Sequence, residues 1–192
     1  AILGSTGSIG ESTLKIVKTT QKFNVELIYA NKNFSKIDYQ IKFFKPKIVI
    51  INNTNIYKKI KKKYEIKKKL IILKNTINLH KYIKTIDITI SAIPGIAGLE
   101  PSLLFIKFSK KVLLANKEAI VCGWELIKAF ATKYNTELIP IDSEHFSIGR
   151  LIKNYSEKNI KKIYITASGG PFLNLNIKKF RNIKPKHAVK HP

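Results

Sequence analysis

The chain has 192 residues and carries 36 Lys and Arg against 12 Asp and Glu, which gives a formal net charge of +24. This length is enough for one sizeable hydrophobic core, or for one core and part of a second. No uninterrupted apolar stretch reaches the ~18 residues of a membrane span, and we therefore expect no membrane span; no signal peptide is visible in the given residues. The single cysteine, Cys122, excludes a disulfide within this chain.

The positive charge is compatible with a nucleic-acid-binding protein, because such a field attracts phosphate backbones. Lysine outnumbers arginine by 34 to 2, however, whereas base and phosphate recognition prefers the guanidinium group. In the densest lysine run, Ile56, Ile60 and Tyr64 recur every four positions, as in a helix with one apolar stripe and a solvated basic face. We therefore favour a solvated surface and expect no nucleic-acid partner, and a basic nucleic-acid-binding module remains the alternative from a different class.

The first predicted elements are a short apolar strand at residues 1–3, a glycine-rich turn at residues 4–10 and a helix at residues 11–17. In a dinucleotide-binding unit, such glycines let the backbone approach the pyrophosphate, which rests against the amides of the helix N-terminus. A glycine turn alone is also compatible with a simple tight turn. The order of the three elements therefore predicts a dinucleotide site without establishing it.

A second predicted strand, residues 25–30, ends in Asn31, Lys32 and Asn33. An NAD-binding protein would place an acidic residue near this point, ~20 residues beyond the glycines, to hold the ribose 2′-hydroxyl. A lysine without an acid favours a 2′-phosphate and hence NADP, although a lysine can stand there by chance in so lysine-rich a chain.

The remaining predicted elements continue the alternation of strands and helices. Small residues at positions 93–98 follow one of the strands and would let a cofactor lie close to the backbone. The pattern predicts an α/β fold with a doubly wound, mainly parallel, Rossmann-like sheet over about the first 135 residues. The further strands are expected at residues 47–52, 70–73, 86–92, 111–115 and 138–141, and the helices at residues 56–64, 79–83, 99–108 and 120–134.

The last of these strands, which we expect to be buried, stops at Asp142, Ser143, Glu144 and His145. Acidic residues are scarce in this chain, and ligands of open α/β sheets bind at the carboxyl ends of strands. Two carboxylates one residue apart can supply two oxygen ligands to a hard divalent cation. Equally, Asp142 or Ser143 can cap the following helix, with Glu144 favoured in its first turn by the helix dipole.

The pattern changes after His145, with a short helix at residues 146–152 and a strand at residues 162–167. The strand leads into a Ser-Gly-Gly turn beginning at Ser168, which offers a hydroxyl and backbone amides to an anion or is a plain loop. We predict a dinucleotide-binding domain at residues 1–135 and the first part of a second, α+β catalytic domain at residues 136–192. We also expect the chain to be a piece of a longer protein, because it starts without methionine and stops with no closing element.

Five separated motifs together resemble the 1-deoxy-D-xylulose 5-phosphate reductoisomerase family of non-mevalonate isoprenoid synthesis. They are residues 4–10, 114–118, 140–145, 166–172 and the closing His191-Pro192, in the family's order and approximate spacing. The Asp-Ser-Glu-His and Ser-Gly-Gly-Pro-Phe motifs are specific, whereas the glycine loop is not. The resemblance implies an NADPH-dependent oxidoreductase that rearranges a linear ketose phosphate to a branched aldehyde and then reduces the aldehyde, with Mg²⁺ or Mn²⁺ as the metal.

The resemblance also implies roles for individual residues. The implied catalytic residues are Lys117, Asp142 and Glu144, of which Asp142 and Glu144 are the metal ligands. Substrate contacts are implied for Lys117, Ser143, Glu144, Ser168 and His191. Cofactor contacts are implied for Thr6, Gly7, Ser8 and Ile9 at the pyrophosphate, for Lys32 and Asn33 at the 2′-phosphate, and for Asn116 and Glu118.

The expected substrate is therefore a small sugar phosphate, 1-deoxy-D-xylulose 5-phosphate, and the expected product is 2-C-methyl-D-erythritol 4-phosphate. The family suggests a homodimer when full length and a bacterial cytoplasmic enzyme, with an organelle not excluded, and we expect no membrane partner. Because other parts of the family's site would lie beyond Pro192, we expect the chain alone to be inactive. Another NADP-dependent dehydrogenase remains the alternative among enzymes, but it leaves Asp142 and Glu144 without a role.

Overall fold

A computed structural model describes residues 1–66, 69–165 and 170–188 of the chain. The contacts between Cα atoms divide it into two compact units, Ala1–Phe146 and Ser147–Pro192, and each unit is described by itself. None of the helices in the described ranges combines the length and the apolar character that a membrane crossing requires.

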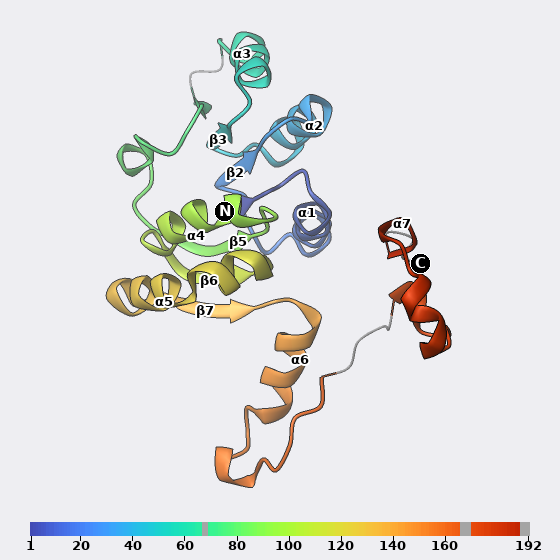
Figure 1. The fold of residues 1–192 in the computed structure, drawn as a ribbon. Helices are drawn as coiled ribbons and strands as arrows, with labels where there is room; N and C mark the ends of the chain where they lie inside the picture. The colour runs from blue at the N-terminus through green and yellow to red at the C-terminus, as the bar shows by residue number, and fades with distance from the viewer. Residues whose placement is uncertain (67–68, 166–169, 189–192) are drawn as a thin grey trace. The chain divides into compact units, whose positions relative to one another are not determined.

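The first unit is built on a seven-stranded sheet with the order β4-β3-β2-β1-β5-β6-β7 (Figure 1). Every neighbouring pair is parallel. The predicted doubly wound, Rossmann-like α/β fold is thus confirmed, and the strand order reverses between β1 and β5, the switch point at which such sheets bind ligands. The strands are β1 (Ile2–Leu3), β2 (Leu27–Ala30), β3 (Ile48–Ile51), β4 (Ile71–Leu73), β5 (Ile86–Ser91), β6 (Ser109–Leu114) and β7 (Glu137–Pro140).

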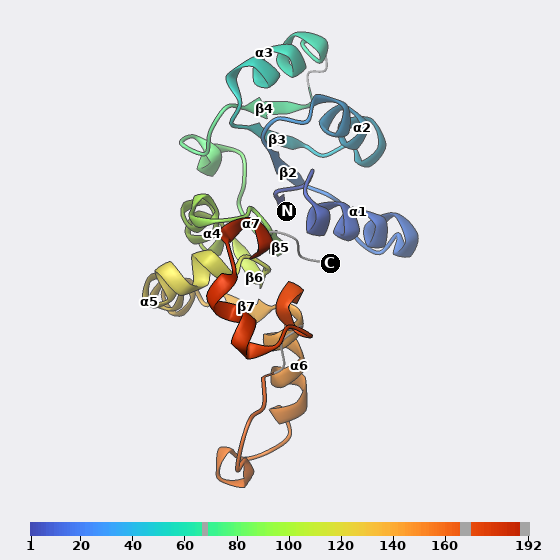
Figure 2. The same cartoon turned by 45° about the vertical axis from the view of Figure 1, so that its right-hand side comes forward.

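Helices cover both faces of this sheet (Figure 2). Leu14, Ile37 and Ile60 bury α1 (Ser8–Thr20), α2 (Phe34–Phe44) and α3 (Thr54–Lys63) against one face of the sheet. Leu79 and Phe105 pack η1 (Leu79–Lys81) and α4 (Leu99–Ile106) against the other face. The 3₁₀ turn η2 (Ile96–Gly98) leads into α4, and α5 (Lys117–Tyr134) joins β6 to β7 and packs in a third cluster with α4 and β6. Strands with apolar side chains on both faces require this arrangement.

One helix of this unit, α2, was not among the predicted elements. Its apolar face consists of Ile37, Ile41 and Phe44, spaced as helical periodicity requires, and the side chain of Asn33 caps its first turn. The helix also contains Tyr39 and Phe43, which are about half exposed and obscure the apolar stripe in the sequence. Helix α5 likewise begins three residues before its predicted start, at Lys117, because Asn116 caps it.

Two predictions after α5 need correction. Strand β7 is an edge strand whose residues are exposed or half-buried rather than buried, because among the described residues it pairs with β6 alone. Residues 162–165, the described part of the strand predicted at 162–167, have no regular secondary structure. A strand requires hydrogen bonds to a neighbouring strand, and none of the strand pairs in the described residues includes this segment.

Helix α6 (Ser143–Ile152) begins in the first unit and ends in the second. The second unit otherwise contains the short helical turns η3 (Glu157–Asn159), η4 (Gly170–Phe172), η5 (Ile177–Asn182) and α7 (Pro185–Ala188). The division into a cofactor domain at residues 1–135 and a catalytic domain from residue 136 concerns function and stays a prediction.

Candidate functional site

The predicted site motifs follow the carboxyl ends of five consecutive strands of the sheet. In the order of the sheet, these are Lys32 and Asn33 after β2, the glycine loop after β1, the turn at residues 93–98 after β5, residues 116–118 after β6 and residues 142–144 after β7. Because all strands are parallel, these ends share one edge. Four strand spacings of about 4.8 Å separate β2 from β7, roughly 19 Å in all.

The glycine loop has the close backbone packing of a dinucleotide-binding turn. Gly4 has φ +80°, and a Cβ atom there would lie 2.6 Å from the carbonyl oxygen of Ala92. A Cβ atom on Gly10 would lie 2.6 Å from the Cα of Ser5, so Gly10 lets α1 approach the loop. Gly7 is the N-cap of α1 and provides no side-chain cap, and the first N–H groups of a helix have no partner within the helix. The loop therefore offers backbone donors to an anion.

The residues predicted to contact the pyrophosphate lie at this helix start. Thr6 is half-buried, whereas Gly7, Ser8 and Ile9 are exposed. Lys32 and Asn33, predicted at the 2′-phosphate, are also exposed, and Asn33 accepts a hydrogen bond from the backbone N–H of Lys36 at 3.0 Å.

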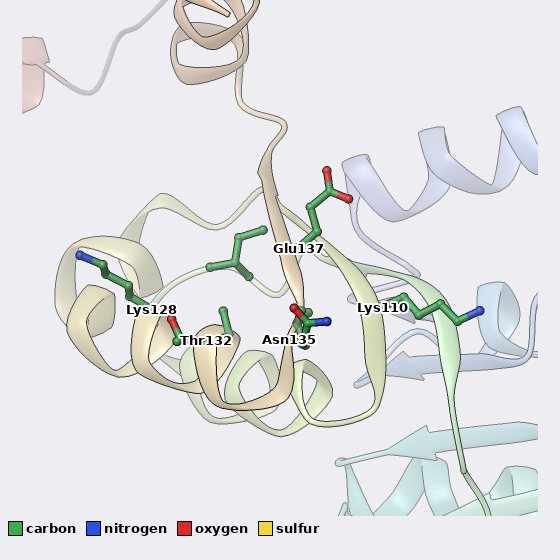
Figure 3. A pocket seen from close by; sticks show the side chains of 8 residues that line it. Lys110, Lys128, Thr132, Asn135 and Glu137 are labelled. Atoms are coloured by element: carbon green, nitrogen blue, oxygen red, sulfur yellow. The ribbon is translucent and has the colours of Figure 1, made fainter. Parts of the chain in front are cut away.

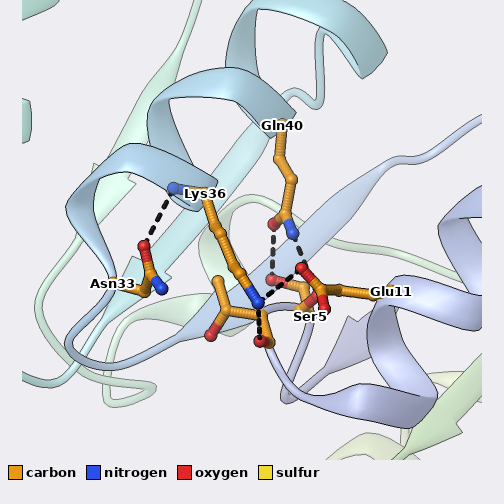
Figure 4. A network of polar contacts seen from close by, with 6 residues as sticks. Ser5, Glu11, Asn33, Lys36 and Gln40 are labelled. Atoms are coloured by element: carbon orange, nitrogen blue, oxygen red, sulfur yellow. Dashed lines mark hydrogen bonds and ion pairs between the residues drawn. The ribbon is translucent and has the colours of Figure 1, made fainter.

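Helix α2 holds the glycine loop through two side chains that sequence reasoning missed (Figure 4). Gln40 Oε1 accepts from Ser5 Oγ at 2.7 Å, and Gln40 Nε2 donates to the carbonyl of Ser5 at 2.9 Å, with both side chains buried. Lys36 Nζ lies 2.6 Å from Glu11 Oε1 and 3.5 Å from the carbonyl oxygen of Thr6. Helix α2 could have been predicted from the sequence, because Asn33 is a typical N-cap residue and is followed by apolar residues at helical spacing.

On the other side of β1, Asn116 is 4% exposed and contacts the turn after β5. Its side-chain oxygen caps α5 by accepting from the N–H of Ala119 at 3.0 Å. Lys117 and Glu118 follow in the first turn of the helix and are exposed.

The structure brings Lys117 together with Glu144, one of the two predicted metal ligands. Lys117 Nζ lies 3.6 Å from Glu144 Oε2, and both side chains are about half exposed. Ser143, predicted to contact substrate, is exposed at the start of α6. A cation and a carboxylate from the starts of two helices therefore face each other at one end of the row of motifs.

The two carboxylate oxygens of Asp142 have different surroundings. Oδ1 accepts from the backbone N–H of His145 at 3.0 Å and lies 2.7 Å from His145 Nδ1, so it caps α6. Oδ2 is buried and has no hydrogen-bond partner among the described residues. Burial raises the pKa of Asp142, but the hydrogen bonds from His145 and the charge of Lys117 lower it by more than burial raises it. The pKa therefore lies below its ordinary value, and the carboxylate is ionised.

A buried, ionised oxygen without a partner is costly unless a cation or a donor meets it. Asp142 thus fits both proposed roles, as the helix cap through Oδ1 and as a cation ligand through Oδ2. Within the described ranges, no group of three or more His, Cys, Asp and Glu is arranged to hold a metal ion. If Asp142 and Glu144 bind a cation, they would supply two oxygen ligands of a set that needs others. Ser168 and His191 lie outside the described residues.

A pocket of about 440 Å³ lies elsewhere in the first unit (Figure 3). Its lining includes Lys128 and Thr132 of α5, and Lys110 and Glu137 at the amino ends of β6 and β7. None of the predicted site residues lines this pocket. Because it lies at the edge of the sheet opposite to the motifs, it is not the candidate site.

Comparisons with known proteins agree with the resemblance seen in the sequence. Residues 1–123 match the family model of 1-deoxy-D-xylulose 5-phosphate reductoisomerase, and residues 138–192 match the model of the C-terminal domain of the same enzyme. The reductoisomerase of Pelagibacter ubique is 50% identical over 199 residues, and that of a Wolbachia strain from Drosophila simulans is 39% identical over 194 residues. Each match covers 100% of this chain, and the chain spans about half the length of these curated relatives.

Solved structures give the same result. A reductoisomerase in complex with NADPH, fosmidomycin and magnesium superposes with a TM-score of 0.82 at 32% identity, over 100% of this chain and 50% of that one. The Zymomonas mobilis enzyme in complex with NADPH superposes with a TM-score of 0.83 at 31% identity, over 100% of this chain and 51% of that one.

Proposed function

Because the chain belongs to the 1-deoxy-D-xylulose 5-phosphate reductoisomerase family, we propose that it supplies the NADPH site and the first metal ligands of that activity. The whole enzyme would convert 1-deoxy-D-xylulose 5-phosphate to 2-C-methyl-D-erythritol 4-phosphate. The observation that carries the proposal is the alignment of the site motifs along one edge of the sheet, from Lys32 after β2 to Glu144 after β7.

The order of the motifs along this edge supports one direction for the bound cofactor. Lys32 and Asn33 would hold the 2′-phosphate, and Thr6, Gly7, Ser8 and Ile9 would hold the pyrophosphate at the start of α1. The nicotinamide half would then lie at the turn after β5 and at Asn116 and Glu118. This direction leaves the carboxylates after β7 beside the reactive end of the cofactor, where a substrate has to bind.

The chemistry near β7 follows from the residue types there. Asp142 Oδ2 and Glu144 would hold a divalent cation, Mg²⁺ or Mn²⁺, because such hard ions prefer carboxylate oxygens. When bound, this cation would stabilise negative charge on two adjacent substrate oxygens. Lys117, whose ammonium group lies 3.6 Å from Glu144 Oε2, would add a positive charge close to the reacting carbonyl group. Ser143 would donate a hydrogen bond to the sugar phosphate.

We propose two further parts of the site, and they rest on the family alone. Ser168 and His191 would contact the substrate and its phosphate, and residues from 136 onward would belong to the catalytic domain. A homodimer of the complete enzyme and a bacterial cytoplasmic location also stay predictions. The curated relatives named above come from bacteria, which supports the bacterial part of the second prediction.

Titration of the chain with NADPH and with NADH, followed by fluorescence, tests the cofactor assignment. We expect NADPH to bind more tightly, and Lys32→Glu to weaken NADPH at least tenfold with little effect on NADH, since a charge-assisted hydrogen bond contributes about 1.5–3 kcal/mol. Lys22→Glu is the matched control, because it makes the same charge change in the exposed segment after α1, at the opposite edge of the sheet. A folded chain that binds neither nucleotide would refute the proposal.

A further inference from the structure

Gln40 is a polar residue at a buried position of α2, and it faces the glycine loop. The residue is 2% exposed and its partner, Ser5, is 0% exposed. Gln40 follows Lys36 by one helical turn, so both side chains reach from the same face of α2 toward the loop (Figure 4). Burial of an amide is costly unless its hydrogen bonds are made. The two bonds between Gln40 and Ser5 are therefore a defined part of the fold at this loop.

The chemistry of Ser5 allows only one orientation of this amide. A carbonyl oxygen can accept a hydrogen bond but cannot donate one, so the Gln40 atom that lies 2.9 Å from the carbonyl oxygen of Ser5 is the nitrogen, Nε2. The other amide atom is then the oxygen, Oε1, which accepts from Ser5 Oγ at 2.7 Å. An ionised carboxylate or an apolar side chain of the same length cannot make both bonds. The position therefore requires an amide.

Strand β2 holds the same part of the loop from another direction. The carbonyl oxygen of Tyr29 accepts from the N–H of Gly4 at 2.8 Å and from the N–H of Ser5 at 3.1 Å. The N–H, the carbonyl and the hydroxyl of Ser5 are thus all bonded, and two of these three groups bond to Gln40. The loop then turns through a bond from the N–H of Gly7 to the carbonyl oxygen of Gly4 at 3.0 Å. Ser5 is therefore the residue from which the free backbone donors at the start of α1 take their position.

We infer that Gln40 is a positioning residue of the dinucleotide site: its amide fixes Ser5 and thereby sets where the backbone N–H groups of residues 6–9 meet the pyrophosphate. This inference rests on the proposed function, which assigns the pyrophosphate to these residues. Hydrogen bonds to an anion weaken steeply when the donor is displaced or turned away. A loop that is no longer held at Ser5 would therefore bind NADPH less tightly, even if the fold is retained.

Calorimetric titration of Gln40→Met with NADPH tests this inference. Methionine has nearly the length of glutamine but makes neither bond, so we expect the Kd of NADPH to rise about tenfold. Thr89→Val is the matched control, because it removes another buried hydrogen bond of the first unit, the 2.7 Å contact between Thr89 Oγ1 and Ser109 Oγ. This contact joins β5 to β6 away from the site motifs, and the Kd should stay within about twofold. An equal loss of affinity in Thr89→Val would assign the effect to general destabilisation and overturn the inference.

Two double variants distinguish action through Ser5 from displacement of the whole helix. Ser5→Ala removes only the hydroxyl and should raise the Kd of NADPH about threefold. Ser5→Ala/Gln40→Met should lose clearly less than the product of the single losses, because both changes break the same bond. Lys32→Glu/Gln40→Met should lose the full product, because Lys32 is assigned to the 2′-phosphate and not to the loop. A full product in the first pair, or clearly less than the product in the second, would overturn the inference.

The remaining outcomes separate the inference from the proposed function. If folded Gln40→Met binds NADPH as tightly as the unsubstituted chain does, the inference fails while the proposed function stands. If the unsubstituted, folded chain does not bind NADPH, the proposed function fails and the inference fails with it. Circular dichroism of each variant checks that the fold is retained. If Gln40→Met does not fold, Ser5→Ala decides the question, because unchanged NADPH affinity in that variant contradicts the inference and the expected loss supports it.

Discussion

Replacement of Asp38 by asparagine should destabilise the first unit in a strongly pH-dependent way. Asp38 lies on α2, and its carboxylate contacts Lys63 Nζ at 2.7 Å, Lys42 Nζ at 2.9 Å and the hydroxyl of Tyr64 at 2.7 Å. The side chain is only 13% exposed. These contacts join α2, which holds the glycine loop, to the end of α3.

The size of the effect follows from the pKa of Asp38. Burial raises this pKa, but the hydrogen bonds from Lys63, Lys42 and Tyr64 lower it more, from the ordinary 3.8 to about 2. Since one pKa unit corresponds to about 1.4 kcal/mol, the ionised form stabilises the fold by about 2 kcal/mol. This stabilisation is complete above about pH 4 and is lost as the pH falls toward 2, because the folded-state pKa is below the unfolded value.

Urea unfolding at pH 7, 5, 3 and 2 measures this prediction. Asp38→Asn should lower the free energy of unfolding by about 2 kcal/mol at pH 7 and 5, by less at pH 3, and by almost nothing at pH 2. Glu137→Gln is the control, because its ion pair with Lys111 at 2.8 Å is half exposed and should contribute less than about 0.5 kcal/mol. A loss that is the same at pH 2 as at pH 7 would refute the electrostatic reasoning.

Two further predictions concern the site itself. Lys36→Met leaves the carboxylate of Glu11 unpaired in the first turn of α1, so NADPH binding should weaken up to about fivefold, the value of a partly exposed ion pair. Lys36→Met/Glu11→Gln should recover most of the affinity, and no recovery in a fluorescence titration would contradict this. Asp142→Asn keeps a residue that can cap α6 but removes the charge on the unpartnered oxygen. Binding of Mn²⁺, measured from the free-ion signal in electron paramagnetic resonance, should weaken roughly tenfold, and unchanged Mn²⁺ affinity would remove Asp142 from the proposed ligand set.

The sequence alone determined the fold class and most of the elements. Alternating apolar strands and helices predicted the parallel sheet, because strands buried on both faces must be apolar along their whole length. The sequence also determined which residue types follow three of the strands: the glycines after residue 3, Lys32 after residue 30 and the carboxylates after residue 140. The family resemblance assigned roles to these residues, and the comparisons support the family.

Sequence patterns failed where the structure depends on a partner distant in the chain. Residues 162–165 have the apolar character of a strand, but none of the described strands pairs with them. Strand β7 is half-buried because it is the last strand of the sheet in the described part of the chain. Helix α2 was missed because its exposed aromatic residues Tyr39 and Phe43 mask the buried stripe.

Only the tertiary structure decided how individual side chains are used. Asn116 stands at a predicted cofactor motif, and the structure shows that both donors of its side-chain amide bond to the backbone of a turn more than twenty residues away in sequence. Asp142 was equally compatible with a helix cap and with a metal ligand. The structure gives one oxygen to the cap and leaves the other buried without a described partner. Spacing along a chain cannot specify such a division, because it depends on which atoms the fold brings within about 3 Å of each other.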